Sequence, residues 1–215
     1  VSKQPNNEST RMIYAHHLDY DKYLEEISVR RETRNIAVFL DEYAPFHPDA
    51  INSGRKLIRW KPYYESITRY FDKLEAETGL EVMIAGHPKS QYKSCQPLFG
   101  NRRVGMDQTV SLVRESKLVL APMSTSLTYA IMFNKPLVFV LPDEYNERYC
   151  GHVDQFSSFL SANVHYSDQG PWSLSDIWEV QTDRYMDFFN QFIKVEGSPN
   201  KLVLDVFLED ISLTV

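Results

Sequence analysis

Four short apolar runs alternate along this chain with longer stretches of helical periodicity. The runs lie at residues 36–40, 81–85, 118–121 and 137–141. Nearly every position in them is apolar, which is typical of parallel strands that are buried on both faces. We therefore predict an α/β fold in which these strands form a doubly wound parallel sheet, with the intervening helices packed on its faces.

The clearest helical pattern lies between the first two predicted strands, at residues 60–78. Pro62 suits the first turn of a helix, and Gly79 is a typical residue for its end. Apolar side chains recur at intervals of three and four residues, so they lie on one face, which we expect to pack on the sheet. This face consists of Trp60, Tyr63, Tyr64, Ile67, Tyr70, Phe71 and Leu74.

Weaker patterns predict the remaining elements. Asp107 is expected to be the N-cap of one further helix. We expect a loop rich in proline and histidine after the strand at 36–40, and a looser stretch at 89–105. The other predicted elements are short strands at 12–16 and 164–166 and helices at 18–30, 107–117, 124–133, 183–193 and 201–211.

The length of 215 residues suits a single domain, and no repeat or linker divides the chain. We expect residues 35–215 to form this domain, with helices at its C-terminal end. Residues 1–34 are expected to be the remnant of a preceding domain or an interdomain linker.

Charge and cysteine content narrow the classes of function. The net charge of −6 argues against non-specific binding of nucleic acid. No apolar run reaches the length of a membrane span, and the polar first residues do not resemble a signal peptide. Cys95 and Cys150 fit no metal-binding or disulfide spacing, which favours a reducing, cytoplasmic location.

A polar cluster directly follows each of the four predicted strands. Because parallel strands end at the same edge of a sheet, where ligands of α/β proteins bind, we expect the clusters to line one crevice. The clusters are Asp41-Glu42, Gly86-His87-Pro88-Lys89, Ser124-Thr125-Ser126 and Asp143-Glu144.

The hydroxyl cluster at Ser124, Thr125 and Ser126 lies between a predicted strand and a predicted helix. Such hydroxyls commonly cap the free N–H groups of the first helical turn. The same position can instead bind a phosphate through N–H groups and hydroxyls. Since three hydroxyls in a row exceed what capping needs, both interpretations stay open.

His87 has a structural and a chemical interpretation. A histidine at a strand end is often only a satisfied structural residue. Here Gly86 allows close backbone approach, Pro88 constrains the turn, and Lys89 adds a positive charge. In this setting His87 could neutralise a phosphate or protonate a leaving oxygen.

The acidic clusters also allow two interpretations. Asp41 and Glu42 are either a solvated turn or a pair that supplies a general base or a ligand for sugar hydroxyls. Asp143, Glu144 and Tyr145 are either a turn or contacts to a ribose or base. No metal site is expected, because His47, Asp49 and the two His-Pro dipeptides match no usual ligand spacing.

Three common nucleotide or nucleophile motifs are absent from the sequence. No GxGxxG follows the first strand, and no P-loop lysine motif is present. A GxSxG nucleophile elbow is missing as well. The sequence therefore argues against a standard dinucleotide fold, a P-loop ATPase and an α/β-hydrolase.

The order of the clusters resembles a known family. Residues 36–142 resemble the nucleotide-sugar-binding half of two-domain (GT-B) glycosyltransferases, most closely bacterial sialyltransferases and related surface-polysaccharide proteins. Asp41-Glu42 corresponds to their D/E-D/E-G motif, with Tyr43 in place of the glycine. His87-Pro88 corresponds to the HP motif, and Ser124-Thr125-Ser126 to the Ser-Ser/Thr motif.

This resemblance implies a Rossmann-like donor-binding domain that transfers a sialic-acid-like sugar from a CMP- or other nucleotide-activated donor to a surface glycan. Asp41 would be the base, while His87 and residues 124–126 would bind the donor phosphate. It implies no cofactor besides the donor, and an acceptor held by a separate N-terminal domain. It also implies peripheral membrane association of the full-length protein.

Two other classes of function remain open from the sequence. One is a non-catalytic domain that binds a nucleotide or a glycan and assembles with partners. The other is a nucleotide-sugar epimerase, which shares the fold and would use the same phosphate cradle.

Overall fold

A single parallel sheet forms the centre of the protein, in a computed structural model that describes residues 12–54, 58–90, 92, 98–145 and 147–212. Six strands occur in this part of the chain, in the order β3-β2-β1-β4-β5-β6, and every neighbouring pair is parallel. The predicted doubly wound parallel sheet is thus confirmed. The strands are β1 (Ile36–Leu40), β2 (Glu81–Ala85), β3 (Val104–Gly105), β4 (Leu118–Ala121), β5 (Leu137–Leu141) and β6 (Asn163–Tyr166).

Successive strands are added to the sheet in opposite directions on the two sides of the β1–β4 pair. The chain runs from β1 outward to β2 and β3, then returns to β4 and continues outward to β5 and β6. In open α/β sheets, this reversal leaves a crevice outside the carboxyl ends of the two central strands. The strand order therefore places the residues after Leu40 and Ala121 at the expected ligand-binding position.

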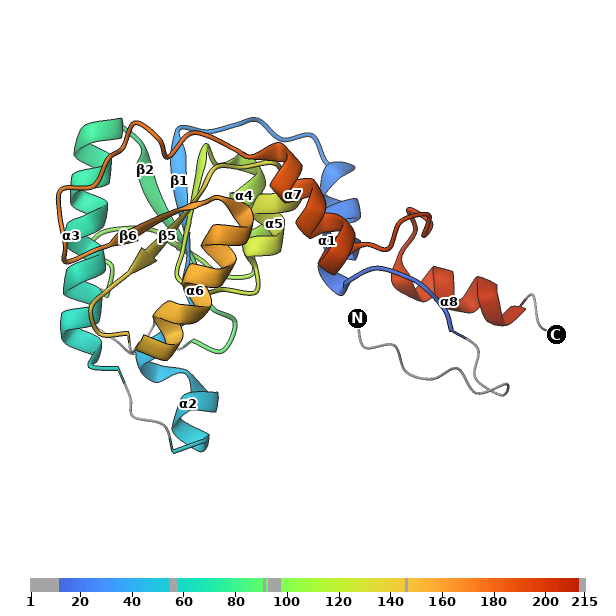
Figure 1. The fold of residues 1–215 in the computed structure, drawn as a ribbon, viewed down its shortest axis with the longest axis horizontal. Helices are drawn as coiled ribbons and strands as arrows, with labels where there is room; N and C mark the ends of the chain where they lie inside the picture. Colours follow the sequence, from blue (N-terminus) through green and yellow to red (C-terminus); the bar gives the residue numbers. More distant parts are fainter. Residues whose placement is uncertain (1–11, 55–57, 91, 93–97, 146, 213–215) are drawn as a thin grey trace.

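Helices cover both faces of the sheet. Helix α3 lies on one side, and α4, α5 and α7 lie on the other (Figure 1). Short α2 lies beyond the end of the sheet (Figure 1). The helices are α1 (Leu18–Ile27), α2 (Pro48–Asn52), α3 (Trp60–Thr78), α4 (Thr109–Glu115), α5 (Leu127–Met132), α6 (Glu147–Leu160), α7 (Thr182–Phe188) and α8 (Val203–Ser212).

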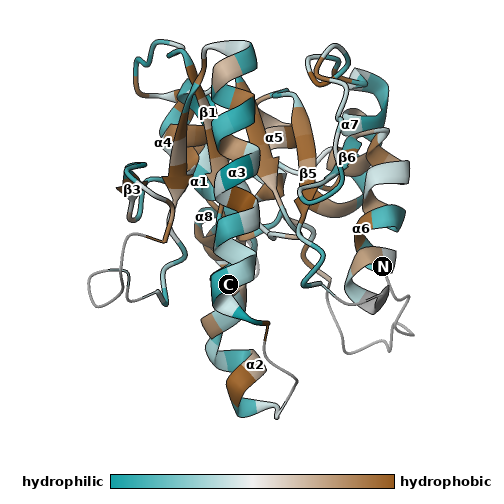
Figure 2. Ribbon diagram, turned by 90° about the vertical axis from the view of Figure 1, so that its left-hand side faces the viewer, coloured by the Kyte–Doolittle hydropathy of each residue, from teal (hydrophilic) through white to brown (hydrophobic). Residues whose placement is uncertain are grey.

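The core lies between the strands and the apolar faces of these helices, as the brown strands of Figure 2 show. All five residues of β1 and of β5 are buried. On α3, six of the seven predicted face residues are buried, and Phe71 packs edge-to-face on Phe39 of β1, with ring centroids 5.1 Å apart. Burying each such ring contributes roughly 1.5–3 kcal/mol.

The prediction for Trp60 was wrong. Its side chain is 44% exposed, although it shares the helical periodicity of the buried residues. Trp60 is the first residue of α3, and its ring faces Phe46 of the preceding 3-10 turn Ala44–Phe46, at 6.5 Å between centroids, instead of a strand. Periodicity alone could not show that the helix begins beyond the sheet.

Several other elements differ from the predictions. Residues 12–16 form no strand; His16 makes only an isolated antiparallel bridge to Lys194. The first helix ends at Ile27, three residues before the predicted end. Asp107 is not an N-cap, because it adopts a left-handed conformation (φ 57°), and Gln108 takes that position. The elements α2, β3 and α6 were not predicted.

The segments near the two termini pack against each other beside the sheet (Figure 1). Tyr20 of α1 donates its hydroxyl hydrogen to Asn200, and Asp21 accepts the backbone N–H of Val203 at the start of α8. Asp19 also accepts hydrogen bonds from two hydroxyls of α5. Among the described helices, none combines the length and apolar character needed to cross a lipid bilayer.

Candidate functional site

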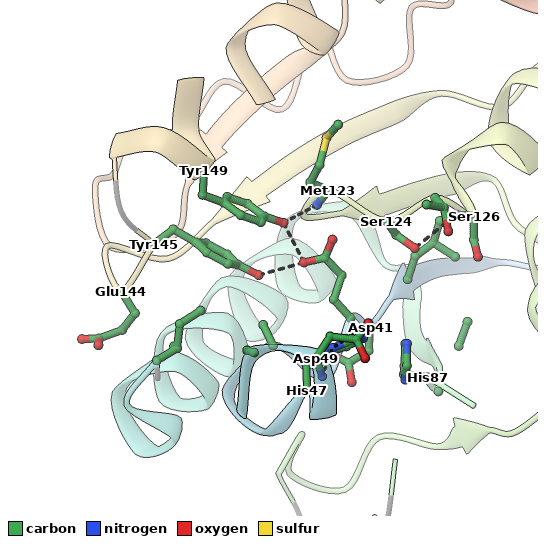
Figure 3. A pocket seen from close by; sticks show the side chains of 18 of the residues that line it. Asp41, His47, Asp49, His87, Met123, Ser124, Ser126, Glu144, Tyr145 and Tyr149 are labelled. Carbon is green, nitrogen blue, oxygen red and sulfur yellow. Dashed lines mark hydrogen bonds and ion pairs between the residues drawn. The ribbon is translucent and has the colours of Figure 1, made fainter. Parts of the chain in front are cut away.

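A cavity of about 1370 Å³ lies at the carboxyl edge of the sheet, where the strand order reverses. All four predicted clusters contribute to its wall (Figure 3). The predicted residues that line it are Asp41, Glu42, Gly86, His87, Pro88, Ser124, Thr125, Ser126, Asp143 and Glu144. Lys89 does not line it; its Nζ lies 3.3 Å from Asp49 Oδ1. The structure therefore brings the clusters together, and their chemical roles remain predictions.

Asp41 directly follows β1 and is buried, with 4% of its surface exposed. Its Oδ2 accepts a hydrogen bond from the Tyr92 hydroxyl, and its buried Oδ1 has no partner among the described residues. Burial raises the pKa of Asp41 to about 6, although the Tyr92 hydrogen bond and nearby backbone N–H groups lower it. The interpretation of Asp41 as part of a solvated turn therefore does not fit, because its side chain is buried.

Glu42 is held by two stacked tyrosines (Figure 3). Tyr149 donates to Glu42 Oε2 at 2.6 Å, and Tyr145 donates to the same oxygen at 3.3 Å. Their rings are parallel, with centroids 3.9 Å apart. Tyr149 also accepts the backbone N–H of Met123 at 2.6 Å, which ties Glu42 to the segment after β4.

Burial raises the pKa of Glu42 to about 7, and the neighbouring Asp41 charge adds to this effect, while the hydrogen bonds from Tyr149 and Tyr145 oppose it. A carboxyl group whose pKa lies near the working pH is suited to general acid–base chemistry. Because the two carboxyls influence each other, they titrate as a pair.

His87 follows β2 and is partly buried on the opposite part of the cavity wall (Figure 3). Its Nδ1 accepts the N–H of Lys89 at 3.2 Å, so in the neutral ring Nε2 carries the proton. Burial lowers the pKa of His87, and the neighbouring His47 and Lys89 lower it further, while Asp49 raises it. These surroundings favour the neutral form of His87, which is an Nε2–H donor, over the charged form that the sequence allowed near neutral pH.

The hydroxyl cluster does less capping than its sequence suggests. The helix expected from Ser124 begins at Leu127, and Ser126 occupies the N-cap position without a side-chain cap. Ser124 Oγ accepts the N–H of Ser126 at 3.3 Å, which leaves its O–H available as a donor. Since α5 has only six residues, the hydroxyls rather than the helix N-terminus are the groups here that could contact a ligand.

The last cluster forms part of the rim. Glu144 makes a two-pronged ion pair with Arg59, at 2.6 Å and 3.1 Å. Asp143 accepts a hydrogen bond from Gln169 at 3.0 Å, and its N–H donates to Asp168. Both acidic side chains thus have protein partners, which fits the turn interpretation at least as well as a ribose contact.

Sequence reasoning missed several residues of the cavity. Tyr149 was not proposed as a site residue, because the chain beyond 143 gave no clear pattern, and Tyr145 was considered only together with Asp143 and Glu144 as a contact to a ribose or base. His47 lines the cavity as well, and the repeated His-Pro dipeptide was the signal that could have identified it. Tyr92 was part of a predicted loop, and nothing in the sequence pointed to its bond with Asp41.

Tyr43 takes the place of the glycine in the D/E-D/E-G motif and adopts a left-handed conformation (φ 54°). This region of backbone conformation is strained for residues with a side chain and easy for glycine. Its ring is buried against Phe46 and Tyr92, with centroids 5.3 Å and 5.5 Å away. Aromatic packing therefore accompanies the strained backbone at this motif position.

Metal ligands are not grouped in the described part of the chain, where no three His, Cys, Asp or Glu side chains are placed to hold an ion. Cys150 is a free, half-buried thiol on α6, and burial raises its pKa. Cys95 lies outside the described residues. Neither observation adds a nucleophile to the cavity.

We expect Gly86→Ala to lower the free energy of unfolding by roughly 1–3 kcal/mol. A Cβ at this position would lie 2.6 Å from Met106 Sδ and 2.9 Å from Tyr92 Cε2, so the missing side chain makes room for the ring that holds Asp41. The sequence had suggested close backbone approach instead. Urea denaturation measures the effect.

The matched control for this variant is Gly151→Ala in α6, where a Cβ would meet no atom within 4 Å. There we expect a gain of roughly 0.5–1 kcal/mol, because alanine favours the helix over glycine. If Gly86→Ala and Gly151→Ala had the same free energy of unfolding, the close contacts at Gly86 would not contribute to stability.

Comparisons with known proteins identify no family. No protein-family model matches the chain, and no curated protein matches its sequence. Solved structures that resemble it include the E. coli ADP-heptose LPS heptosyltransferase II, at 19% sequence identity and a TM-score of 0.33. That match covers 58% of this chain and 38% of the heptosyltransferase chain, so this chain spans well under half of that protein.

Proposed function

We propose that this domain binds the nucleotide-activated donor of a glycosyltransferase and contributes the base for sugar transfer. The observation that carries the proposal is the composition of the cavity wall. A carboxyl pair with raised pKa values, buried at Asp41 and partly buried at Glu42, lies in the same cavity as His87 and the hydroxyls of Ser124 to Ser126. Transfer of a sugar from a phosphate requires both kinds of group.

The proposed reaction is a single displacement. The oxygen of an acceptor hydroxyl attacks the anomeric carbon of the donor, a carboxylate of the Asp41–Glu42 pair takes the hydroxyl proton, and the bond from that carbon to the phosphate oxygen breaks. The negative charge that develops on the departing phosphate is stabilised by N–H and O–H donors, namely His87 and the serine and threonine hydroxyls. The carboxyl pair thus supplies the base, and His87 with the hydroxyls on the other side of the cavity stabilises the leaving phosphate.

The size of the cavity supports a substrate of this class. Sites for drug-sized ligands commonly enclose roughly 300–1,000 Å³. The volume of about 1370 Å³ leaves room for a nucleotide sugar and for the entering acceptor hydroxyl. The motif order favours a CMP-activated, sialic-acid-like donor and a surface glycan acceptor, which a second domain would hold.

The proposal is tested by measuring the binding of CMP, UDP and GDP with calorimetry and with thermal-shift assays. We expect one nucleoside phosphate to bind with a Kd between micromolar and millimolar and to raise Tm, since a ligand of the native state stabilises it. The matched control is the nucleoside without phosphate, which should bind far more weakly. Absence of binding by all three nucleotides would refute the donor site, and turnover of a nucleotide sugar without any acceptor would favour the epimerase.

A further inference from the structure

Two His-Pro turns lie side by side on the cavity wall. One is His47-Pro48-Asp49 at the start of α2, and the other is His87-Pro88-Lys89 after β2. The two imidazole rings meet edge to face, with centroids 5.0 Å apart. The third residues of the turns also pair, with Lys89 Nζ 3.3 Å from Asp49 Oδ1.

Both histidines have the same internal hydrogen bond. In each turn, Nδ1 accepts the backbone N–H two residues later, at 3.2 Å in both cases. An imidazole nitrogen that accepts a hydrogen bond carries no proton, so the proton of each neutral ring is on Nε2. The two turns thus provide two oriented Nε2–H donors within one cavity.

We propose that His47 and His87 bind the phosphate group of the nucleotide donor together, and that the pair takes up a proton when the phosphate binds. His47 is assigned here as a second phosphate ligand, in addition to the residues of the HP and hydroxyl motifs. This inference rests on the proposed function, because it presumes that the cavity receives a phosphate.

The charges around the pair explain the proton uptake. Without a ligand, burial and the proximity of His47 and Lys89 disfavour a charge on His87. Two imidazolium rings with centroids 5.0 Å apart would repel each other, and a negatively charged phosphate beside both offsets that repulsion. A group that gains charge when a ligand binds must take its proton from the solvent.

Other groups at this wall also affect binding as the pH changes. Asp41 and Glu42 lose negative charge as the pH falls through about 6 and about 7, which favours an anion as well. The Asp49–Lys89 ion pair lies beside the two turns, and burial raises the pKa of the Tyr92 hydroxyl beside His87, so this hydroxyl stays neutral. The pH dependence of the wild type alone therefore does not identify the histidines, and variants are required.

Asparagine is the suitable replacement, because its side-chain oxygen can accept the same backbone N–H that Nδ1 accepts, while the Nε2–H donor is lost. The test variants are His47→Asn and His87→Asn. His17→Asn is the matched control, since His17 Nδ1 accepts the N–H of Asp19 at 3.2 Å in the same way, and His17 does not line the cavity.

Calorimetry with CMP at pH 6.5, in two buffers of different ionisation enthalpy, measures both affinity and proton uptake. We expect His47→Asn to weaken CMP binding roughly tenfold to a hundredfold and to reduce the proton uptake. His17→Asn should leave both values unchanged. The carboxyl pair is present in all variants, so the difference from the wild type reports the histidines.

The outcomes separate this inference from the proposed function. If His47→Asn binds CMP with the wild-type affinity and proton uptake, the inference is wrong, while the donor site stands. Should CMP, UDP and GDP all fail to bind, inorganic pyrophosphate is the probe. Binding of pyrophosphate that depends on His47 would keep the two-histidine site and refute the donor proposal. Failure of pyrophosphate and nucleotides alike would overturn both.

Discussion

Asp41→Asn is expected to stabilise the protein at pH 8 by about 2–3 kcal/mol. Burial raises the pKa of Asp41 from 3.8 to about 6, so keeping this carboxyl ionised in the native state costs free energy. One unit of pKa difference between native and unfolded states corresponds to about 1.36 kcal/mol. Asparagine removes the charge, and its oxygen can still accept the Tyr92 hydroxyl.

The sign of the pH dependence follows from the same shift. Because the pKa of Asp41 is higher in the native state than in the unfolded state, the native protein binds more protons between about pH 4 and pH 6. The contribution of Asp41 to wild-type stability is fully present below about pH 4 and is lost as the pH rises through about 6. The advantage of Asp41→Asn should therefore be small at pH 4 and complete at pH 8.

Urea denaturation across this pH range measures the effect. Asp49→Asn is the control, because its side chain is 70% exposed and its removal should change stability by less than about 1 kcal/mol at any pH. Part of the gain in Asp41→Asn arises at Glu42, whose ionisation the Asp41 charge disfavours. If Asp41→Asn were less stable than the wild type at pH 8, the ionised Asp41 carboxylate would be stabilised by its surroundings, and the prediction would be wrong.

The sheet could be predicted because its signal is local. Each central strand is a short apolar run, and the structure begins and ends β1, β2, β4 and β5 at the predicted residues. Burial on both faces removes polar residues from such strands, so the sequence itself marks their ends. The short edge strand β3 and the small helix α2 carry no such signal, because only Gly105 of β3 is buried and no residue of α2 is.

Helix α6 shows a different limit. Its apolar positions are mixed with polar ones, and it follows a segment that has no clear periodicity. Its place is decided by contacts with β5, β6 and α7, and of these only β5 had a clear signal in the sequence. The prediction for Trp60 failed for the opposite reason. The periodicity was clear, but the sheet does not extend beneath the first turn of α3.

The location of the site could be predicted, because the carboxyl ends of parallel strands share one edge of the sheet. The hydrogen bonds between its side chains could not be predicted. The contact of Asp41 with Tyr92 joins residues 51 positions apart, and that of Glu42 with Tyr149 joins residues 107 positions apart. Nothing local to either carboxylate reveals these hydrogen bonds. The sequence allowed these two residues to be a solvated turn, whereas in the structure they are a hydrogen-bonded carboxyl pair with raised pKa values.

The second large effect concerns the division of labour in sugar transfer. Asp41→Asn is expected to reduce transfer by the complete enzyme roughly 10²–10⁴-fold, the contribution of a general base, while CMP affinity stays within about threefold of the wild type. The reason is that a base acts on the acceptor hydroxyl and not on the donor phosphate. His87→Asn should instead weaken CMP binding by roughly 1.5–3 kcal/mol, because it removes a hydrogen bond to a charged group.

Single-turnover transfer assays and calorimetry on the two variants measure these effects. Glu42→Gln belongs in the same series, since the carboxyls titrate as a pair and the series shows which of them takes the proton. If Asp41 is the base, Glu42→Gln should retain more transfer than Asp41→Asn, and the acidic limb of its pH profile should stay near that of the wild type, because Glu42 is already protonated where Asp41 titrates. Equal losses of nucleotide affinity in Asp41→Asn and His87→Asn would contradict the division of labour, because a carboxylate that acts only on the acceptor has no reason to hold the donor.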